Sequence, residues 1–379
     1  MRSYLIWLEY GANFVFSIFC IWFLFDFKKN MIIKNNFEIS LDKFINFALY
    51  DKKKGYYMQK NPFGRKGDFI TAPNISRMFS EMIAIWVLGF WENLGNPKKI
   101  NLVELGAGDG EMMKILHETF KKFPSFLNSC NILIYEKSLK LKKIQKNKLD
   151  KDKIIWISDL KEIKKFPTIF IANEFFDAMA IKQFTKKKDL WFERYVNFEN
   201  KKKAFFYEKV FNMKKFEKEI GYNISKNQKF IEYSLVGINY LKKIAKIIKK
   251  NSGGLLIIDY GYMEKKMKNT LKSISNHKHS NVLENIGKSD ITHNINFFLF
   301  KKIIDQLGDL NNLTTTQGSF LVKLGIKDRA GVISQNQSFS KKADIYYRLK
   351  RLIDEKEMGN LFKVMFIKKK NNKYRLGFN

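Results

Sequence analysis

The segment Val103-Glu-Leu-Gly-Ala-Gly-Asp-Gly110 constrains the fold more than any other part of the chain. An apolar run leads into it, three glycines follow at alternate positions, and a stretch with helical spacing begins at Glu111. Glycine permits backbone conformations and close approaches that a Cβ atom would block. The free N–H groups at the start of the following helix would face any ligand on the turn. The segment therefore predicts a buried strand, a sharp turn and a helix that together form one wall of a ligand site.

Apolar runs of strand length recur along the chain, and stretches with the apolar spacing of helices separate them. The expected strands are Ile100–Leu105, Ile132–Tyr135, Ile154–Ile157, Thr168–Ala172 and Gly254–Ile258. The expected helices are one capped by Ser40, one from Ser76 to Leu94 that stops at Gly95, one from Glu111 to Lys122 that is ended by Pro124, and one from Tyr240 to Lys249. Strands that are apolar on both faces are typical of a parallel sheet covered by helices on each side. We therefore expect an α/β fold with a Rossmann-like sheet.

We expect residues 31–379 to form a single domain around this sheet, with an N-terminal helical segment and a lid. The stretch of about 182–228 is charged and aromatic, and it interrupts the alternation of strands and helices. We interpret it as an inserted subdomain with antiparallel strands that faces the substrate. A C-terminal extension of about 296–370 should add a helix and further strands.

Residues 1–30 form a separate apolar segment with three open interpretations. The run Gly11–Phe25 is shorter than the roughly 20 residues that a membrane span needs, and extending it back to Tyr4 includes an acidic residue. The segment lacks the clear basic start and the small-residue cleavage site of a signal peptide. It could be a membrane anchor through residues 4–27, a buried helix, or sequence upstream of a true start at Met31.

Composition narrows the class of protein. Of the 379 residues, 45% are hydrophobic and 15% are aromatic, which excludes a mainly disordered chain. The two cysteines and four histidines show no spacing for a disulfide framework or a zinc site, so we expect no metal. The formal net charge of +33 would suit a polyanionic partner. The lysines are spread over every segment, however, which favours a general bias in composition.

The residues around the glycine turn distinguish between two classes of cofactor. The dinucleotide pattern needs its last glycine where Glu111 stands, and a carboxylate there is unfavourable beside a pyrophosphate. The observed spacing of Gly106, Gly108 and Gly110, preceded by Glu104, instead resembles motif I of class I methyltransferases.

Two further acids follow the next expected strands. Glu136 closes the second strand, where its carboxylate could accept both hydroxyl groups of a ribose. Asp159 follows the third strand, where such enzymes often hold the amino group of adenine. Together with the glycine turn, these acids predict a site for S-adenosyl-L-methionine. The alternative is a tight turn with surface acids.

Asn173, Glu174 and Asp177 follow the fourth expected strand. Ligands of open α/β sheets bind beyond the carboxyl ends of the strands, so these side chains should face the transferred methyl group. A carboxylate can hold a guanidinium with two hydrogen bonds and fix its plane, so we expect the three residues to be catalytic. The alternative is that Asn173 caps a helix and Asp177 forms an ion pair elsewhere. A nucleic-acid amino-methyltransferase would carry an Asn/Asp-Pro-Pro-aromatic run here, and this loop lacks the prolines.

The chain from about Phe37 to Lys370 resembles the MidA-type methyltransferases, a family that includes the mitochondrial protein-arginine methyltransferase of complex I assembly. The matching stretches are Gly55–Tyr57, Asn61–Gly64, Gly67–Pro73, Ile75-Ser76, Glu104–Gly106, Asn173–Ala178, Asp259–Gly261, Thr270-Leu271 with His277, Asp290–His293 with Asn296-Phe297, Gln317-Gly318 with Phe320-Leu321, and Met358–Lys363. Asn74, Ser80 and Ala107 stand where the family usually has an acid, a glycine and a proline.

The resemblance implies a class I methyltransferase fold, S-adenosyl-L-methionine as the cofactor and an arginine of a protein as the substrate. We expect Gly67 and Asp68 to belong to a lid over the cofactor, and a plain turn is the alternative. His277 and His293 could line the mouth of the substrate site, or backbone carbonyl groups could hold them.

Two other classes of function stay open at this point. A non-catalytic assembly or binding protein would have no need of Gly106, Gly108 and Glu136. A nucleic-acid methyltransferase would suit the positive charge but not the loop after the fourth strand. We therefore expect a protein partner, with a subunit of respiratory complex I as the candidate, and no specific nucleic acid. The N-terminus lacks the Arg/Ser-rich amphipathic pattern of a mitochondrial import signal, which favours a bacterial cytoplasm over the mitochondrial matrix.

Overall fold

The computed structural model describes residues 36–59, 62, 71–199, 203–275 and 278–378. The apolar segment 1–30 and the expected site residues Gly67, Asp68 and His277 lie outside these ranges. No helix in the described part of the chain is both long and apolar enough to cross a membrane.

The main sheet confirms the expected α/β fold with a largely parallel sheet. Its eight strands run in the order β15-β16-β10-β5-β2-β3-β4, and β14 pairs with β10. The strands are β2 (Ile100–Leu105), β3 (Cys130–Tyr135), β4 (Ile154–Ile157), β5 (Thr168–Asn173), β10 (Gly253–Tyr262), β14 (Ile295–Asn296), β15 (Leu310–Thr316) and β16 (Phe362–Lys369). The strands β4, β3, β2, β5 and β10 are parallel, whereas β16 runs antiparallel to both β10 and β15. Every residue of β2 and β5 is buried, as their continuous apolar runs predict.

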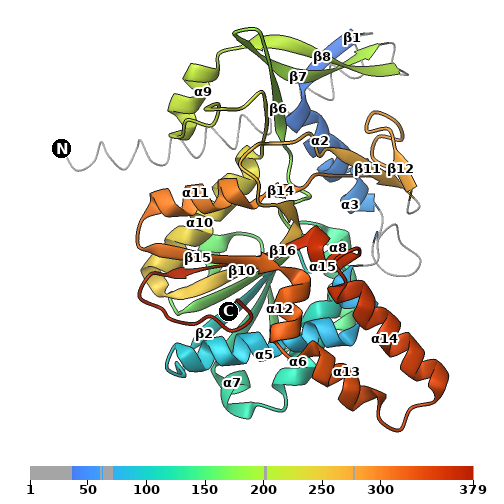
Figure 1. Cartoon of the computed structure of the whole chain (residues 1–379), viewed down its shortest axis with the longest axis vertical. Coiled ribbons are helices and arrows are strands. Elements are labelled where there is room, and N and C mark those ends of the chain that lie inside the picture. Colours follow the sequence, from blue (N-terminus) through green and yellow to red (C-terminus); the bar gives the residue numbers. More distant parts are fainter. Residues whose placement is uncertain (1–35, 60–61, 63–70, 200–202, 276–277, 379) are drawn as a thin grey trace.

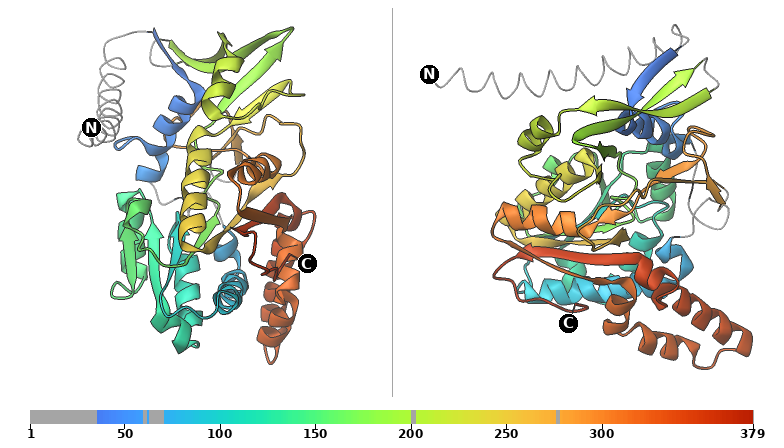
Figure 2. Two further views of the ribbon diagram at one scale, coloured as in Figure 1. Left: turned by 90° about the vertical axis from the view of Figure 1, so that its left-hand side faces the viewer. Right: turned by 45° about the horizontal axis from the view of Figure 1, so that its top comes forward.

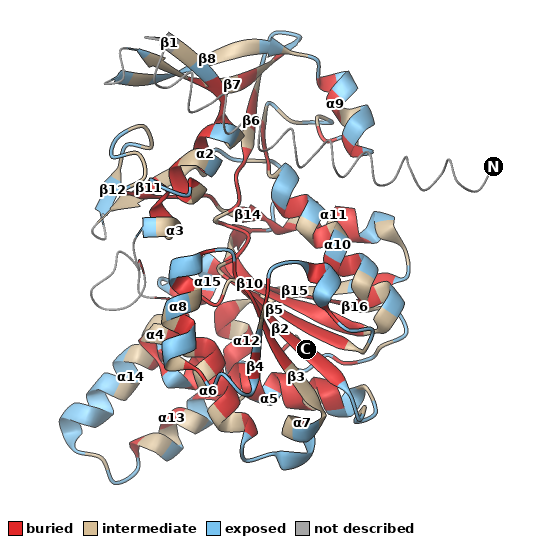
Figure 3. Ribbon diagram, turned by 180° about the vertical axis from the view of Figure 1, so that it is seen from behind, coloured by how far each residue is buried: buried red, intermediate tan, exposed pale blue. Residues whose placement is uncertain are grey.

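Helices cover both faces of this sheet, and the sheet separates two apolar cores (Figure 1, Figure 3). The helices α5 (Arg77–Asn93), α6 (Glu111–Phe120) and α12 (Gln317–Lys323) contribute to one core, and α10 (Leu235–Asn251) and α11 (Phe297–Leu307) contribute to the other. The helix α5 is buried on nearly all sides, as expected. Ser76 caps its first turn by accepting a hydrogen bond from the N–H of Met78 (3.2 Å), and the chain turns away at Gly95, where φ is +86°.

Three expected helix ends differ from the structure. The helix α6 stops at Phe120, and Pro124 begins a further short helix, α7 (Pro124–Ser129), because proline is tolerated in the first turn of a helix. The helix α10 starts at Leu235, five residues before the expected position, with Ser234 as its cap. Ser40 directly precedes α2 (Leu41–Tyr50), but its hydroxyl donates to Asp42 instead of capping the helix.

A second layer of the molecule lies above the carboxyl ends of the main parallel strands (Figure 1, Figure 2). It contains a sheet of β1 (Asn36–Ser40), β7 (Leu190–Glu199), β6 (Lys182–Lys187), β9 (Phe230–Tyr233) and β8 (Lys203–Phe211), and a sheet of β12 (Lys278–Ser280), β11 (Lys272–Ser275) and β13 (Asp290–Thr292). The helices of this layer are α2, α3 (Tyr56–Gln59) and α9 (Met213–Ile220). The antiparallel strands expected between 182 and 228 are present, and β1 joins them from the start of the described chain. The division into a domain and an insertion stays a prediction.

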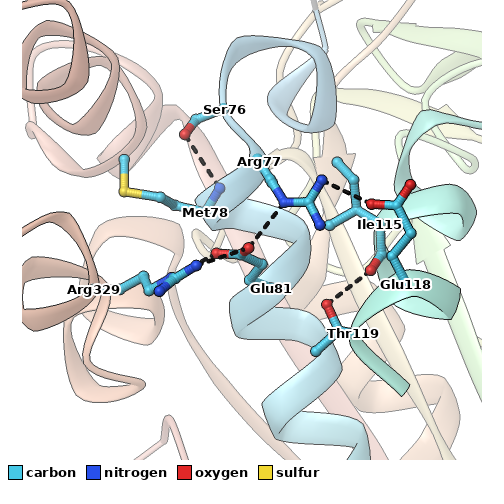
Figure 4. A network of polar contacts seen from close by, with 8 residues as sticks. All are labelled: Ser76, Arg77, Met78, Glu81, Ile115, Glu118, Thr119 and Arg329. Carbon is cyan, nitrogen blue, oxygen red and sulfur yellow. Dashed lines mark hydrogen bonds and ion pairs between the residues drawn. The ribbon is translucent and has the colours of Figure 1, made fainter. Parts of the chain in front are cut away.

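The C-terminal part contains more helices than the single one expected. After α11 the chain forms α12, α13 (Ile326–Ser334), α14 (Phe339–Ile353) and α15 (Met358–Leu361) before β16. A polar network ties this region to α5 (Figure 4). Glu81 accepts two hydrogen bonds from Arg329 (2.7 and 3.1 Å) and one from Arg77 (3.0 Å), and Arg77 also pairs with Glu118 of α6 (2.8 Å). Partial burial would raise the pKa of Glu81, but the two guanidinium groups outweigh it and lower that pKa. The network therefore joins α5, α6 and α13 on this face of the sheet.

Candidate active site

A cavity lies where the carboxyl ends of β2, β3, β5 and β10 meet the second layer. Each of those strands contributes residues to its wall directly or through the loop that follows it. The wall includes Tyr50, Tyr57, Gly106, Gly108, Glu136, Lys137, Ser138, Glu174, Asp177, Tyr260, Lys272, Asp290 and Thr292. The cavity therefore brings together the glycine turn, the acid after β3 and the acidic loop after β5.

The turn between β2 and α6 has the backbone that its glycines predict. The φ angles of Gly106, Gly108 and Gly110 are +68°, +53° and +83°, all in the left-handed region that favours glycine. Gly106 and Gly108 line the cavity, whereas Gly110 caps α6 outside its wall. A Cβ atom on Gly106 would lie 2.9 Å from a ring carbon of Phe175, so this position has no space for a side chain.

Two buried carboxyl groups flank this turn in different ways. Glu136 lines the cavity directly after β3, and its two oxygens accept from the N–H of Ser138 (2.8 Å) and from Gln145 Nε2 (3.2 Å). These bonds fix the carboxylate and leave lone pairs for the hydroxyl groups of a ligand. Glu104 is buried behind the turn, and its Oε2 has no hydrogen-bond partner among the described residues. Burial, with the nearby charges of Asp109 and Glu136, raises the pKa of Glu104 to about 8.

The loop after β5 turns two carboxyl groups into the cavity. Glu174 has a φ of +51°, an uncommon conformation for a residue with a side chain, and its N–H donates to Ile258 O of β10 (2.9 Å). Burial and the charge of Asp177 raise the pKa of Glu174 to about 8. Burial raises the pKa of Asp177 to about 6, although the hydroxyl of Thr292 donates to its Oδ2 (3.0 Å) and opposes the shift.

Asp259 holds this loop from the neighbouring strand. It is fully buried near the end of β10, and its Oδ2 accepts from the N–H groups of Phe176 (2.9 Å) and Asp177 (3.3 Å). Its Oδ1 accepts from the N–H of Tyr260 (2.9 Å). Burial and the charges of Asp177 and Glu174 raise its pKa well above the ordinary value. In the sequence, Asp259 belongs to the stretch Asp259–Gly261 that matches the family, but the sequence alone predicts no role for it.

Residues that the sequence reasoning missed enter the cavity from the second layer. Lys272 of β11 and Asp290 of β13 line it near Asp177, and the Lys272 ammonium lies 4.9 Å from the centre of the Tyr260 ring. Burial lowers the pKa of Lys272, and the charges of Asp177 and Asp290 oppose that shift. Tyr50 also lines the cavity, and its hydroxyl donates to Ala178 O (3.0 Å), directly after Asp177 in the chain. Asp290 belongs to a stretch that matches the family in the sequence, whereas Lys272 and Tyr50 belong to none.

Besides Glu104 and Gly110, three more expected site residues lie outside the cavity wall. Asp159 is exposed and outside the cavity wall, and its carboxylate caps the 3₁₀ turn η1 (Leu160–Glu162) by accepting from the N–H of Lys161 (2.9 Å). Asn173 stands behind the wall and donates to Glu174 Oε1 (3.2 Å). His293 is buried with its Nε2 at 3.1 Å from Met179 O, so of its two alternatives the structure supports retention by a carbonyl group.

Comparison with known proteins gives the family. The model of an S-adenosyl-L-methionine-dependent methyltransferase family matches residues 82–315, which is more than half of the chain. The protein "Protein arginine methyltransferase NDUFAF7, mitochondrial" of Xenopus tropicalis is 28% identical over 366 residues, covering 87% of this chain and 82% of its own length. The human protein of the same name is 26% identical, with 87% and 80% covered.

A solved structure shares the fold. A protein from Burkholderia thailandensis with bound S-adenosyl-homocysteine superposes with a TM-score of 0.74 and 22% identity, covering 90% of this chain and 89% of its own. The family resemblance found in the sequence is thereby confirmed, and the chain belongs to the S-adenosyl-L-methionine-dependent methyltransferases of this family.

Proposed function

We propose that the protein methylates arginine side chains of a protein substrate and that the cavity holds both cofactor and substrate. The observation that carries the proposal is the presence of Glu174 and Asp177 in the same cavity as Gly106 and Glu136. A glycine-lined approach for the cofactor and a pair of carboxyl groups for a cation therefore share one space. The names of the relatives from frog and human support arginine as the acceptor.

The cavity fits the cofactor that the family requires. Gly106 and Gly108 present backbone without side chains to the cavity, so a ligand can approach closely there. Glu136 is buried, fixed by two hydrogen bonds and able to accept from the ribose hydroxyl groups. Glu104 and Gly110 shape the turn from outside the wall. S-adenosyl-L-methionine supplies an electrophilic methyl group when bound. The roles expected for Asp159 at adenine and for Gly67 and Asp68 in a lid stay predictions.

The loop after β5 holds the guanidinium group of the substrate. A guanidinium stays protonated at neutral pH because its pKa is above about 12, so negative charge must compensate for it. Asp177, with a pKa of about 6, is ionised in the free protein at neutral pH. The entry of a cation lowers the pKa of Glu174 from about 8 and ionises it as well. Asn173 orients Glu174 through its hydrogen bond to Oε1.

Positioning contributes more to this reaction than proton transfer does. Attack on the methyl group needs one guanidinium nitrogen to be in line with the breaking bond, and two carboxylates fix the plane of the group. The transfer releases one proton from that nitrogen, and a carboxylate of Glu174 or Asp177 accepts it. The rings of Tyr50 and Tyr57 line the same cavity, where aromatic rings can contact a planar cation.

We also propose a substrate protein and a compartment. A subunit of respiratory complex I is our candidate substrate, as the family resemblance implies. A bacterial cytoplasm is the compartment we propose, with the mitochondrial matrix as the alternative. We propose association with a membrane only through residues 4–27, in the case that they act as an anchor.

The identity of the methylated residue tests the proposal. Purified protein is incubated with S-adenosyl-L-methionine labelled in its methyl group and with a cell lysate, and protein is then separated from nucleic acid. We expect the label in the protein fraction and, after acid hydrolysis, in methylarginine. Label in methyllysine, methylglutamine or a nucleobase would contradict the assignment of arginine.

Asp259 gives a prediction about the positioning of the loop. Asp259→Ala removes the acceptor of two buried N–H groups, and each lost bond costs about 1–3 kcal/mol of local stability. We expect the methylation rate to fall at least tenfold (about 1.4 kcal/mol) while S-adenosylhomocysteine still binds. Asp259→Asn, which keeps one acceptor oxygen, should recover part of the rate. An unchanged rate in the alanine variant would show that Asp259 does not position the loop.

A further inference from the structure

We infer that a lysine-rich rim beside the cavity binds an acidic segment of the substrate protein, the segment that carries the methylated arginine. This inference rests on the proposed function, because it concerns how that substrate is recognised. The rim consists of Lys52, Lys53, Lys54, Lys137, Lys140, Lys143 and Lys288, all of them exposed.

The rim lysines come from three parts of the chain, and these parts contact one another. Lys52, Lys53 and Lys54 connect α2 to α3, and α3 packs on α8 (Leu139–Lys148), which carries Lys140 and Lys143 (Figure 1). The hydroxyl of Ser138, the cap of α8, donates to Tyr57 O (2.8 Å). A Cβ atom on Gly287 would lie 2.2 Å from Lys54 O, so the loop of Lys288 adjoins the same turn.

The rim also borders the cavity. Lys137 lines the cavity wall and is exposed, and it directly follows Glu136 in the chain. Tyr57 and Ser138, which join α3 to α8, line the cavity as well. A peptide whose arginine entered the cavity would therefore pass over the rim lysines with its neighbouring residues.

Few negative charges oppose the rim. The helix α8 has five lysines and no acid in its ten residues, whereas the whole chain has 70 basic and 37 acidic residues. Asp51 is buried and accepts from the N–H groups of Lys53 (2.9 Å) and Lys54 (2.8 Å), so its charge is turned away from the surface. Within the described ranges, the side chains of Lys52, Lys53 and Lys143 form no ion pair. Their positive charge is available to a partner.

The contrast between rim and cavity selects the kind of partner. The cavity wall has four carboxyl groups, those of Glu136, Glu174, Asp177 and Asp290, and two lysines, Lys137 and Lys272. The cavity thus favours a cationic side chain, while the rim favours anionic neighbours. An arginine flanked by aspartate or glutamate satisfies both surfaces. A nucleic acid would satisfy the rim but has no cationic group for the cavity.

Binding of short synthetic peptides to the full-length protein tests this inference without requiring methylation. Three peptides carry one central arginine flanked by glutamates, by serines or by lysines, and their dissociation constants are measured by calorimetry at low and at physiological salt with S-adenosylhomocysteine present. We expect the glutamate peptide to bind at least about fivefold more tightly than the serine peptide, with the difference shrinking at higher salt. A glutamate peptide in which alanine replaces the central arginine should bind more weakly than the arginine-containing glutamate peptide.

A matched pair of variants separates the rim from the overall positive charge. The rim variant changes Lys52, Lys53 and Lys143 to Glu, and it should lose the preference for the glutamate peptide. The control changes three other exposed lysines, Lys98, Lys164 and Lys165, to Glu. These lysines precede β2 and β5, at the amino ends of the strands and thus at the end of the sheet opposite the cavity. The control should keep the preference for the glutamate peptide.

Any of three outcomes would overturn the inference. The three peptides could bind equally, or the rim variant and the control could lose the preference for the glutamate peptide to the same degree. A single-stranded oligonucleotide could also bind more tightly than the glutamate peptide and lose that binding in the rim variant. Failure of the proposed function would look different. The label of the lysate experiment would then be absent from methylarginine, and replacement of the central arginine would not weaken peptide binding, whatever the rim variant did.

Discussion

Gly106→Val should abolish measurable binding of S-adenosylhomocysteine while the protein keeps its overall fold. The φ angle of Gly106 is +68°, which a β-branched residue adopts only with strain, and the new side chain would meet the ring of Phe175. Gly106 also lines the cavity, so the branched side chain would occupy space that the ligand needs. Calorimetry should show affinity weaker by at least about a hundredfold, or about 2.7 kcal/mol. Circular dichroism should show that the helices and strands persist.

Gly221→Val is the matched control for backbone strain. Gly221 ends α9 with a φ of +70°, and a Cβ atom placed on it would meet nothing within 4 Å. This variant should lose stability from the same left-handed conformation while binding S-adenosylhomocysteine with the parent affinity. Unchanged affinity in Gly106→Val, or equal loss of affinity in both variants, would remove the glycine turn from the cofactor site.

Glu174→Gln should lower the methylation rate by at least roughly a hundredfold, equivalent to about 2.7 kcal/mol in the activation barrier, with cofactor affinity near normal. Glutamine keeps the size of the side chain and part of its hydrogen bonding, but it removes the charge that compensates for a guanidinium. Asp177→Asn should cost less, because the Asp177 oxygen that accepts from Thr292 is already engaged in the structure. Glu284→Gln, at an exposed position outside the cavity wall, serves as the control and should keep the parent rate.

The pH dependence gives a second signature of Glu174. A carboxyl group with a raised pKa gains its charge only as the pH rises through that value. The kcat/KM of the parent should therefore increase with pH through about 6 and again through about 8, the pKa values of Asp177 and Glu174 in the free protein. The step near 8 should be absent in Glu174→Gln. The carboxylates do not hold the substrate if both variants, Glu174→Gln and Asp177→Asn, methylate protein at the parent rate.

The sequence predicted the centre of the fold well because those parts are encoded locally. The bounds of β2 and β4 follow from apolar runs and their flanking turn residues, and the structure has the expected ends. The pairing of β1 with β7 could not be predicted, because it joins residues more than 150 positions apart and depends on the packing of the second layer. The extra C-terminal helices were missed for a similar reason, since partners such as Arg329 and Glu81 come from distant segments.

The sequence likewise predicts the site residues that follow the parallel strands but not those that come from the second layer. Side chains in the loop after a parallel strand, such as Glu136, Glu174 and Asp177, can be placed near a ligand from strand order alone. Lys272 and Asp290 come from short antiparallel strands of the second layer, and strand order says nothing about which of their side chains face the cavity. Asp159 carried a local signal that was overlooked, since an acid followed three positions later by Glu162 is a capping pattern, and the structure shows that capping box.

A crystal structure of the protein with S-adenosylhomocysteine would test most directly whether the cavity is the site of methyl transfer. We expect the ribose hydroxyl groups within hydrogen-bond distance of the Glu136 carboxylate, the amino-acid part of the ligand against Gly106, and the sulfur atom facing Glu174 and Asp177. A ligand bound elsewhere, or one whose sulfur faces away from the loop after β5, would contradict the proposed arrangement of cofactor and substrate.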